Sequence, residues 1–253
     1  MPLILVTNDD GIRSEGIKAL YRELSEIGDA YIVAPESEKS AVSHALTMHR
    51  PLRVAQIDEK IFTVNGTPTD CVVVAVEKIL PERPVVIASG INRGANLGDD
   101  VTYSGTVSAA IEGTLFSIPS MAISLVYRNG EQMLYFSTAA RFAKTLVAYI
   151  LRKGLPPDTL LNVNVPNIRY EDIKGVKFTR QGKRSYDNAI HETFDPWGRK
   201  HFWIGGGTPT WQAGNDTDFN AVSEGYISIT PIHLDLTNYE ALDHMRKNWQ
   251  DIL

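Results

Sequence analysis

Short apolar runs of strand length alternate with amphipathic segments along the first two thirds of the chain. The apolar runs are Leu3–Val6, Tyr31–Ala34, Val85–Ala88, Met121–Leu125 and Leu160–Val165. Between them, apolar residues recur at helical spacing in segments near residues 17–27, 71–80, 104–116 and 138–152. Apolar strands that alternate with amphipathic helices are typical of a parallel sheet covered on both faces. The pattern therefore predicts an α/β fold, with a Rossmann-like, doubly wound and mostly parallel sheet over residues 1–165.

The pattern changes after Pro166, where polar and aromatic stretches flank turn-rich sequence. The stretches are Lys174–Arg180 and Lys200–Ile204, and the turn-rich parts are Asp195–Gly198 and Gly205–Gly207. We expect residues 166–253 to form a C-terminal extension with β-hairpins, a strand over Ala221–Ile232 and a terminal helix over Asn238–Trp249. Long aromatic arms often pack against another subunit, so we expect a homo-oligomer, and a self-packed subdomain is the alternative.

Composition narrows the function classes. The chain has 253 residues, of which 43% are hydrophobic and 22% are charged, as in ordinary globular proteins. The net charge is −5 and no run of five or more basic residues occurs, so we expect no nucleic-acid duplex as partner. Cys71 is the only cysteine, which excludes a disulfide framework and favours a place in the core. The apolar N-terminus ends at Thr7, too early for a signal peptide or a membrane span, so we expect a cytoplasmic protein.

Small and polar residues follow three of the predicted strands directly. These clusters are Thr7–Gly11, Ala34–Ser40 and Ser89–Asn96. In a doubly wound sheet, ligands bind in the crevice beyond the carboxyl ends of the strands. We therefore expect the three loops to share one pocket.

Asp9 and Asp10 are the centre of this expected pocket. Adjacent carboxylates at a strand end repel each other unless a cation or a proton lies between them. Oxygen ligands from these acids, the Ser40 hydroxyl and the Asn92 amide suit one divalent cation, Mg²⁺, Mn²⁺ or Ca²⁺, better than structural zinc. The alternative is that Asp10 and Gly11 form an ordinary turn and that Asp9 caps the next helix.

A helix expected to begin after Ser104 offers a second kind of site. Val107, Ala110, Ile111 and Thr114 recur at helical spacing and predict its buried face. A helix that begins with Ser-Gly-Thr presents unpaired N–H groups, hydroxyls and a positive dipole end, which suit a phosphate. An ordinary capped helix is the alternative, and the nearby loop of residues 92–96 favours the phosphate site.

Other candidate residues carry weaker signals. His44 and His49 could move a proton, although a lone histidine is more often a surface or packed residue. Asp216 and Asp218 follow the glycine cluster, where solvated acids are expected. The side chains of Trp197, Trp203 and Trp211 suit interface contacts or base stacking.

Several of these motifs occur in the same order and spacing as in one known family. They are Asn8–Gly11, Ala34–Ser40, Ser89–Gly94 with Asn96, Tyr103–Thr106, Ala109–Gly113, Gly66–Cys71, Asn162–Pro166 and Gly225–Pro231. Together they closely resemble the survival protein E (SurE) family over nearly the whole chain. The resemblance implies a metal-dependent 5′/3′-nucleotidase that acts on nucleoside monophosphates, and in some members on short polyphosphate. It also implies a Rossmann-like core and homodimers or homotetramers formed by C-terminal exchange.

The resemblance also assigns roles to individual residues. It implies that Asp9, Asp10, Ser40 and Asn92 bind the metal and that Asn96, Ser104, Gly105 and Thr106 contact the phosphate. We expect Asp9, Asp10, Asn96 and Ser104 to take part in catalysis, with one of the two acids orienting or deprotonating the attacking water. The donor of the leaving-group proton, the base preference and the 5′ or 3′ selectivity stay open.

The rival class is a regulatory module without turnover. Receiver domains also place paired acids after the first strand to bind Mg²⁺, but they need a phosphoacceptor Asp after the third strand, where this chain has Ser89 and Gly90. A nucleotide-binding protein without hydrolysis is a further alternative, although the glycine-rich dinucleotide and Walker patterns do not occur. A haloacid-dehalogenase phosphatase would need Asp-x-Asp, which Asn8-Asp9-Asp10 does not match.

Overall fold

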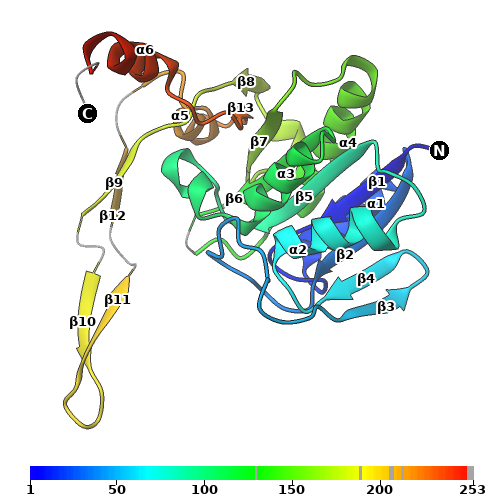
Figure 1. Ribbon diagram of the computed structural model, residues 1–253, viewed down its shortest axis with the longest axis horizontal. Coiled ribbons are helices and arrows are strands. Elements are labelled where there is room, and N and C mark those ends of the chain that lie inside the picture. The colour runs from blue at the N-terminus through cyan, green and yellow to red at the C-terminus, as the bar shows by residue number, and fades with distance from the viewer. Residues whose placement is uncertain (129, 188–189, 205–207, 212–213, 250–253) are drawn as a thin grey trace.

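One sheet organises the molecule, and an arm, formed by the two paired-strand ribbons between residues 184 and 211, extends away from it (Figure 1). The computed structural model describes residues 1–128, 130–187, 190–204, 208–211 and 214–249. The sheet is nine-stranded, in the order β3-β4-β2-β1-β5-β6-β7-β13-β8. Its strands from β4 to β7 all run parallel, which confirms the predicted Rossmann-like, mostly parallel arrangement.

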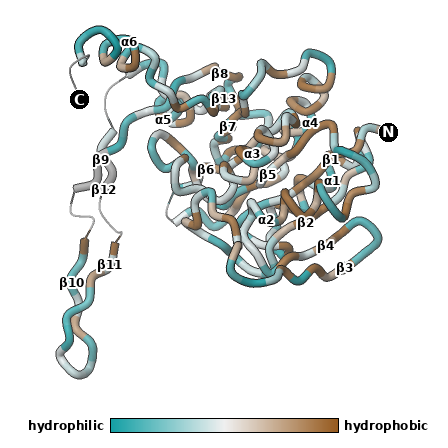
Figure 2. The backbone as a smooth tube through the Cα atoms, viewed as in Figure 1, coloured by the Kyte–Doolittle hydropathy of each residue, from teal (hydrophilic) through white to brown (hydrophobic). Residues whose placement is uncertain are grey.

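All five strands expected from the apolar runs are present in the parallel part of the sheet. They are β1 (Leu3–Thr7), β2 (Asp29–Pro35), β5 (Val86–Arg93), β6 (Ser120–Val126) and β7 (Thr159–Pro166). Side chains along β1 are buried throughout, as expected for a strand covered on both faces. Figure 2 shows the corresponding hydrophobic stretches in the body of the molecule.

Helices cover both faces of this sheet. The helix α1 (Glu15–Leu24) packs with α4 (Phe136–Lys153) on one core cluster, whereas α2 (Pro68–Val74) and α3 (Gly105–Leu115) contribute to clusters with other residues of the sheet. Cys71 lies buried in α2, as predicted. The expected helix over residues 71–80 is two segments, because a π-helical turn (Ala75–Ile79) follows α2. Short 3₁₀ turns occupy Gly98–Thr102 and Tyr170–Asp172.

The strands at the two edges of the sheet were not all predicted. The antiparallel pair β3 (Val54–Asp58) and β4 (Ile61–Val64) lacks a long apolar run, because polar residues alternate with apolar ones in β3. At the other edge, β13 (Ile227–His233) pairs antiparallel with β7, and β8 (Val176–Phe178) pairs parallel with β13. The division at residue 165 stays a prediction, but the sheet itself continues past it.

The prediction of one strand over Ala221–Ile232 is wrong in its first part. Residues Asp218–Ser223 form a helix, α5, and only β13 is a strand. The Thr217 hydroxyl accepts a hydrogen bond from the Asn220 N–H at 3.3 Å, which caps the helix. Gly225 then reverses the chain with a φ of 88°, in the left-handed region that favours glycine.

The C-terminal extension contains the predicted hairpins and terminal helix. Its elements are β9 (Arg184–Asp187), which pairs with β12 (Thr208–Trp211), β10 (Ile190–Phe194), which pairs with β11 (Lys200–Ile204), and α6 (Tyr239–Asn248). The Gly205–Gly207 part of the prediction lies outside the described residues. The hairpin of β10 and β11 lies far from the sheet (Figure 1), and all ten of its strand residues are exposed. A search of the described helices finds none that is long and apolar enough to cross a membrane.

Candidate active site

Hydrogen bonds join the three polar loops at the carboxyl ends of β1, β2 and β5. The Lys39 N–H donates to the backbone oxygen of Asp9 at 2.7 Å, and the Arg93 N–H donates to Asp10 Oδ2 at 3.0 Å. Asp10, Glu38 and Arg93, one from each loop, line a single cavity of about 220 Å³. The loops therefore share one pocket, as the position of their strands in the sheet predicts.

Asp9 is buried beside the first turn of α3. Its side chain is 7% exposed, and its Oδ1 accepts a hydrogen bond from the Thr106 hydroxyl. Burial raises the pKa of Asp9 to about 6, although the Thr106 hydrogen bond lowers it and the neighbouring Asp10 raises it further. A carboxyl group with this pKa is largely ionised at neutral pH, but at a cost that a bound cation would offset.

Asp10 lines the cavity described above, which Asp9 does not, and it is half-buried. Burial raises its pKa, the hydrogen bond from the Arg93 backbone lowers it, and the charge of Glu38 raises it again. Two adjacent acids with raised pKa values at one strand end are typical of a functional site, because structural acids usually gain partners that lower their pKa.

Ser40 and Asn92 lie on the same loops as the groups that contact these acids. The Ser40 hydroxyl donates to Glu38 Oε1, and the Asn92 amide donates to the Gly94 oxygen at 3.0 Å. Among the described residues, neither side chain hydrogen-bonds to Asp9 or Asp10. The backbone N–H groups of the adjacent residues Lys39 and Arg93 do hydrogen-bond to Asp9 and Asp10. The fold therefore brings all four predicted metal ligands to one edge of the sheet, but their side chains do not contact one another there as a complete ligand set would.

Asn96 lies further along the same edge and is held by β6 and β7. Its Nδ2 donates to the Ser124 hydroxyl at 2.7 Å, and its backbone oxygen accepts from the Asn162 and Asn164 amides at 2.8 and 2.9 Å. An amide nitrogen carries two N–H bonds, so the contact with Ser124 uses only one of them. Within the part of the chain that the structure describes, the other N–H has no acceptor, so we expect it to meet a ligand oxygen.

Ser104 is the N-cap of α3, as predicted. Its Oγ accepts from the Val107 N–H at 3.1 Å, which leaves the hydroxyl hydrogen for another acceptor. Gly105 passes so close to Asp9 that an added Cβ would lie 2.8 Å from the Asp9 Cβ, so only glycine fits there. Thr106, expected at the phosphate, donates its hydroxyl to Asp9 in this structure, and its phosphate contact stays a prediction.

The donor set fits a hard divalent cation. Asp9 and Asp10 supply carboxylate oxygens, Ser40 and Asn92 add neutral oxygens, and the buried Asp9 gains most from a nearby positive charge. Among the described residues, no group of three or more His, Cys, Asp or Glu side chains could hold a metal alone. A cation in this pocket would therefore also need neutral oxygen donors and water.

The structure also reveals contacts that the sequence did not indicate. The prediction of a solvated Asp218 is wrong, because this carboxylate is 0% exposed and accepts backbone hydrogen bonds from Gly98 and Gly182, both at 2.8 Å. Asp216 is exposed, as expected, and pairs with Arg180 at 2.9 Å.

His44 lies 2.7 Å from Glu112 Oε2 in the middle of α3. The sequence could have indicated the contacts of Asn162 and Asn164 with Asn96, because polar residues at alternate positions of a buried strand lie on one face of the sheet.

Comparison with known proteins places the chain in a family. The family model of survival protein SurE matches residues 4–188. A protein of Geotalea uraniireducens named 5′-nucleotidase SurE is 51% identical over 244 residues, which cover 96% of this chain and 98% of that protein. A protein of the same name from Geobacter sulfurreducens is 53% identical over 239 residues, which cover 94% and 90%.

A solved structure supports the same assignment. The crystal structure of the SurE protein from Aquifex aeolicus matches with a TM-score of 0.86 and 43% identity, covering 97% of this chain and 99% of that chain. The resemblance expected from the ordered motifs is thus confirmed, and the chain belongs to the survival protein SurE family.

Proposed function

We propose that this chain is a metal-dependent 5′-nucleotidase, which hydrolyses nucleoside 5′-monophosphates to nucleoside and phosphate. Its family membership and the name of its relatives support a phosphomonoesterase. The observation that carries the proposal for this chain is the position of Asp9, a buried acid against the N-terminus of α3. That position supports a cation site next to an anion site, as a phosphate ester bound through a metal requires.

The residues divide between holding the cation and holding the phosphate. Asp9, Asp10, Ser40 and Asn92 would hold a divalent cation, which when bound supplies Lewis-acid stabilisation of the phosphoryl charge. Asn96 offers an amide N–H and Ser104 offers a hydroxyl hydrogen to the phosphoryl oxygens. Gly105 and Thr106 open α3, whose positive dipole end favours the developing charge. One of the two acids orients or deprotonates the attacking water.

The high activation barrier of phosphate monoester hydrolysis supports this division between cation-binding and phosphate-binding residues. Enzymes accelerate the hydrolysis of phosphate monoesters by up to ~10²¹-fold, whereas one general acid or base supplies only about 10²- to 10⁴-fold. Most of the acceleration must therefore come from positioning and charge stabilisation at the phosphoryl group. Two adjacent acids, one of them against a helix N-terminus, meet that requirement better than a single proton-transfer residue.

The finer parts of the proposal concern substrates and surroundings. We expect 3′-monophosphates and short polyphosphate as further substrates, and Mg²⁺ or Mn²⁺, with Ca²⁺ as an alternative, as the metal. A cytoplasmic location stays a prediction, and Cys71, a buried free thiol, suits a reducing compartment.

We further propose that the protein is a homodimer or homotetramer joined through the arm. Ile190, Phe202, Trp203 and Ile204 are between 60% and 90% exposed on a two-stranded hairpin that projects from the body (Figure 1). An isolated hairpin is marginally stable in water, and exposed apolar side chains in such numbers mark an interaction surface. A second copy of the chain is the partner that the family resemblance implies.

A phosphate-release screen tests the activity. The purified protein is incubated with AMP, GMP, 3′-monophosphates, polyphosphate and sugar phosphates, with EDTA or with Mg²⁺, Mn²⁺ or Ca²⁺. We expect multiple turnovers on nucleoside 5′-monophosphates, abolished by EDTA and restored by a divalent ion. Stoichiometric labelling by acetyl phosphate without turnover would instead favour the regulatory module, and chelator-insensitive hydrolysis would refute the metal requirement.

A further inference from the structure

The segment 96–104 connects two residues of the proposed phosphate site. Asn96 begins it and Ser104 ends it, and the 3₁₀ turn Gly98–Thr102 lies between them. On the Asn96 side the sheet holds the segment, through Asn162, Asn164 and Ser124. Beyond Asn96, Val101 packs into a core cluster with Val107 and Leu160, the Ser43 N–H donates to the Tyr103 oxygen at 3.2 Å, and the other contacts come from the C-terminal extension.

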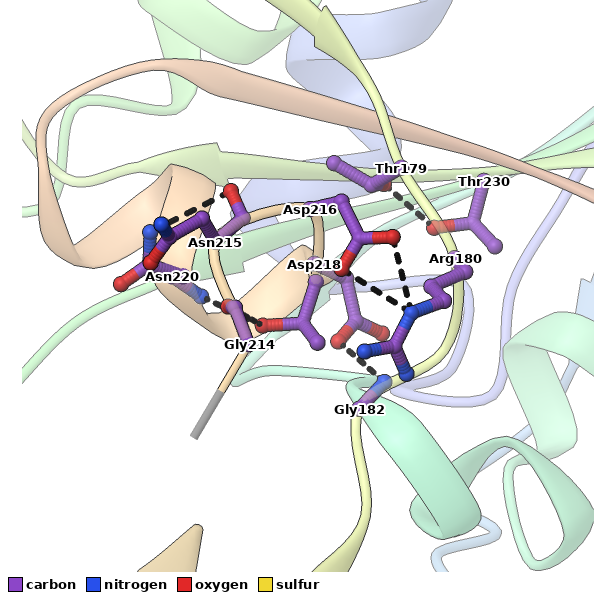
Figure 3. Close-up of polar contacts among 10 residues, drawn as sticks. Thr179, Arg180, Gly182, Gly214, Asn215, Asp216, Asp218, Asn220 and Thr230 are labelled. Atoms are coloured by element: carbon purple, nitrogen blue, oxygen red, sulfur yellow. Dashed lines mark hydrogen bonds and ion pairs between the residues drawn. The ribbon is translucent and has the colours of Figure 1, made fainter. Parts of the chain in front are cut away.

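Asp218 makes the most buried of these contacts. Its Oδ2 accepts the Gly98 N–H at 2.8 Å, and its Oδ1 accepts the N–H groups of Gly182 and Phe219, also at 2.8 Å. Figure 3 shows the Asp218 carboxylate facing the Gly182 backbone, whereas the neighbouring Asp216 faces Arg180. Asp218 thus ties the segment to two points of the extension with one fully buried carboxylate.

Two further contacts lie beside it. The Gln181 amide donates to the Gly98 oxygen at 3.1 Å, and Arg184 forms an ion pair with Asp100. Gly98 has a φ of 53°, and an added Cβ would lie 2.6 Å from the Gly182 oxygen, so the two backbones are in direct contact. These residues, 181–184 and Asp218, lie where the arm joins the body, and we call them the arm base. The arm base therefore packs against Gly98 and Asp100 in the middle of the segment.

We propose that Asp218 is a positioning residue, which fixes the segment 96–104 so that Asn96 and Ser104 can contact the phosphate together. This inference rests on the proposed phosphate site. A buried carboxylate that accepts three N–H groups is strongly directional, and loss of its charge leaves those donors poorly satisfied. Displacement of a binding group by about 1 Å can lower the rate ~10²-fold. The metal ligands lie outside the segment, so cation binding does not depend on Asp218.

The test compares Asp218→Asn with Asp216→Asn, a neighbouring acid that is exposed and contacts Arg180. Four properties are measured at a temperature where both variants are folded: Mn²⁺ affinity, affinity of the Mn²⁺-loaded protein for inorganic phosphate, kcat and KM for AMP, and hydrogen exchange of residues 97–104. For Asp218→Asn we expect unchanged Mn²⁺ affinity, weaker phosphate binding, a kcat/KM lowered about 10- to 100-fold and faster exchange. Asp216→Asn should match the parent in all four.

The outcomes separate this inference from the proposed function. If Asp218→Asn folds and keeps the parental phosphate affinity and hydrogen exchange, the inference is wrong even though the parent hydrolyses AMP. The inference is also wrong if the variant loses as much Mn²⁺ affinity as phosphate affinity. A parent without AMP hydrolysis refutes the proposed function, while the exchange of residues 97–104 and phosphate binding still decide the inference. If Asp218→Asn does not fold, Gln181→Ala replaces it, with a smaller change in the same direction expected and parental phosphate binding and exchange contradicting the inference.

Discussion

The carboxyl edge of the sheet and the hairpin arm are built in opposite ways. At the edge, short polar loops follow strands whose side chains are almost all buried, and the side chains of Asp9, Asp10 and Asn96 have contacts from distant parts of the chain. In the arm, β10 and β11 contact mainly each other, and every residue of both strands is exposed. The difference teaches that the chain alone can form the proposed catalytic pocket, whereas the hairpin needs another surface to bury its apolar residues.

The two regions nevertheless meet at one place. The base of the arm contacts the segment 96–104 through Asp218, Gln181 and Arg184. The hairpin tip has no such contact among the described residues. The comparison therefore predicts that changes at the sheet edge alter chemistry, changes at the tip alter association, and changes at the arm base alter phosphate binding.

The largest effect is expected from Asp9→Asn. The variant removes a negative charge from the proposed cation site but keeps the shape of the side chain, so phosphate release from AMP should fall by at least about 10³-fold. Circular dichroism should show an unchanged fold. The control is Asp99→Asn, since Asp99 is an exposed acid of the nearby 3₁₀ turn. Chelator-insensitive activity in Asp9→Asn would contradict the assignment of chemistry to this edge.

The next effect concerns the hairpin of β10 and β11. The double variant Phe202→Ser, Ile204→Ser replaces two apolar side chains that lie on one face of β11. If both are buried between copies, each change costs about 2 kcal/mol or more, and association weakens by roughly 10³-fold or more. Light scattering after size-exclusion chromatography measures the mass of the particle.

The control and the activity sharpen this second prediction. His201→Ser changes an exposed polar residue of the same strand and should leave association unchanged. Each dissociated chain should still hydrolyse AMP, since the site residues belong to one chain. A parent that is monomeric at micromolar concentrations would contradict the proposed role of the arm.

A third prediction uses the pKa of Asp9 in the metal-free protein. The value is raised from 3.8 to about 6 on folding, so between these pH values the folded state binds more protons than the unfolded state. Stability therefore falls as pH rises through this window, by roughly 3 kcal/mol in total for this group. Asp9→Asn should remove that loss and unfold in urea at higher concentration than the parent at pH 7, but not at pH 4.

Saturating Mn²⁺ provides the control for this third prediction. A cation favours the ionised form of Asp9, so the parent should become more stable than Asp9→Asn when metal is present. A metal-free parent whose stability does not fall between pH 4 and 6 relative to Asp9→Asn would show that the buried acid is not the cause.

The sequence predicted those elements whose formation depends on neighbouring residues, such as apolar strands and capped helices. The parallel strands are apolar throughout, and Ser104 caps α3 because its side chain reaches an N–H three residues later. The strand β3 was missed because Gln56 and Asp58 interrupt its apolar pattern at the exposed edge of the sheet. Pairing with a neighbour, rather than local hydrophobicity, makes that segment a strand.

The site shows the same limit. Asp9 and Asp10 were predicted as site residues because they directly follow a strand, and the parallel topology implies which loops meet. Their role stays a prediction. Asp218 was assigned wrongly because its partners Gly98 and Gly182 are distant in sequence and contribute backbone groups, which have no residue-specific signal. Thr106 was assigned to the phosphate, but its contact with Asp9 depends on how α3 approaches β1.

The smallest predicted effect is that of Ser104→Ala, and it is the sharpest test of the difference between the two regions. The variant loses a phosphate donor and a helix cap, so KM for AMP should rise about 10-fold and the free energy of unfolding should fall by about 1 kcal/mol. Asn238→Ala is the matched control, because Asn238 caps α6 in the C-terminal extension in the same way, accepting the Ala241 N–H at 2.9 Å. It should lose no more stability than Ser104→Ala and keep the parental KM. If the two variants change KM equally, or if Ser104→Ala changes Mn²⁺ affinity instead, then Ser104 acts only as a cap, and the end of α3 does not hold the phosphate.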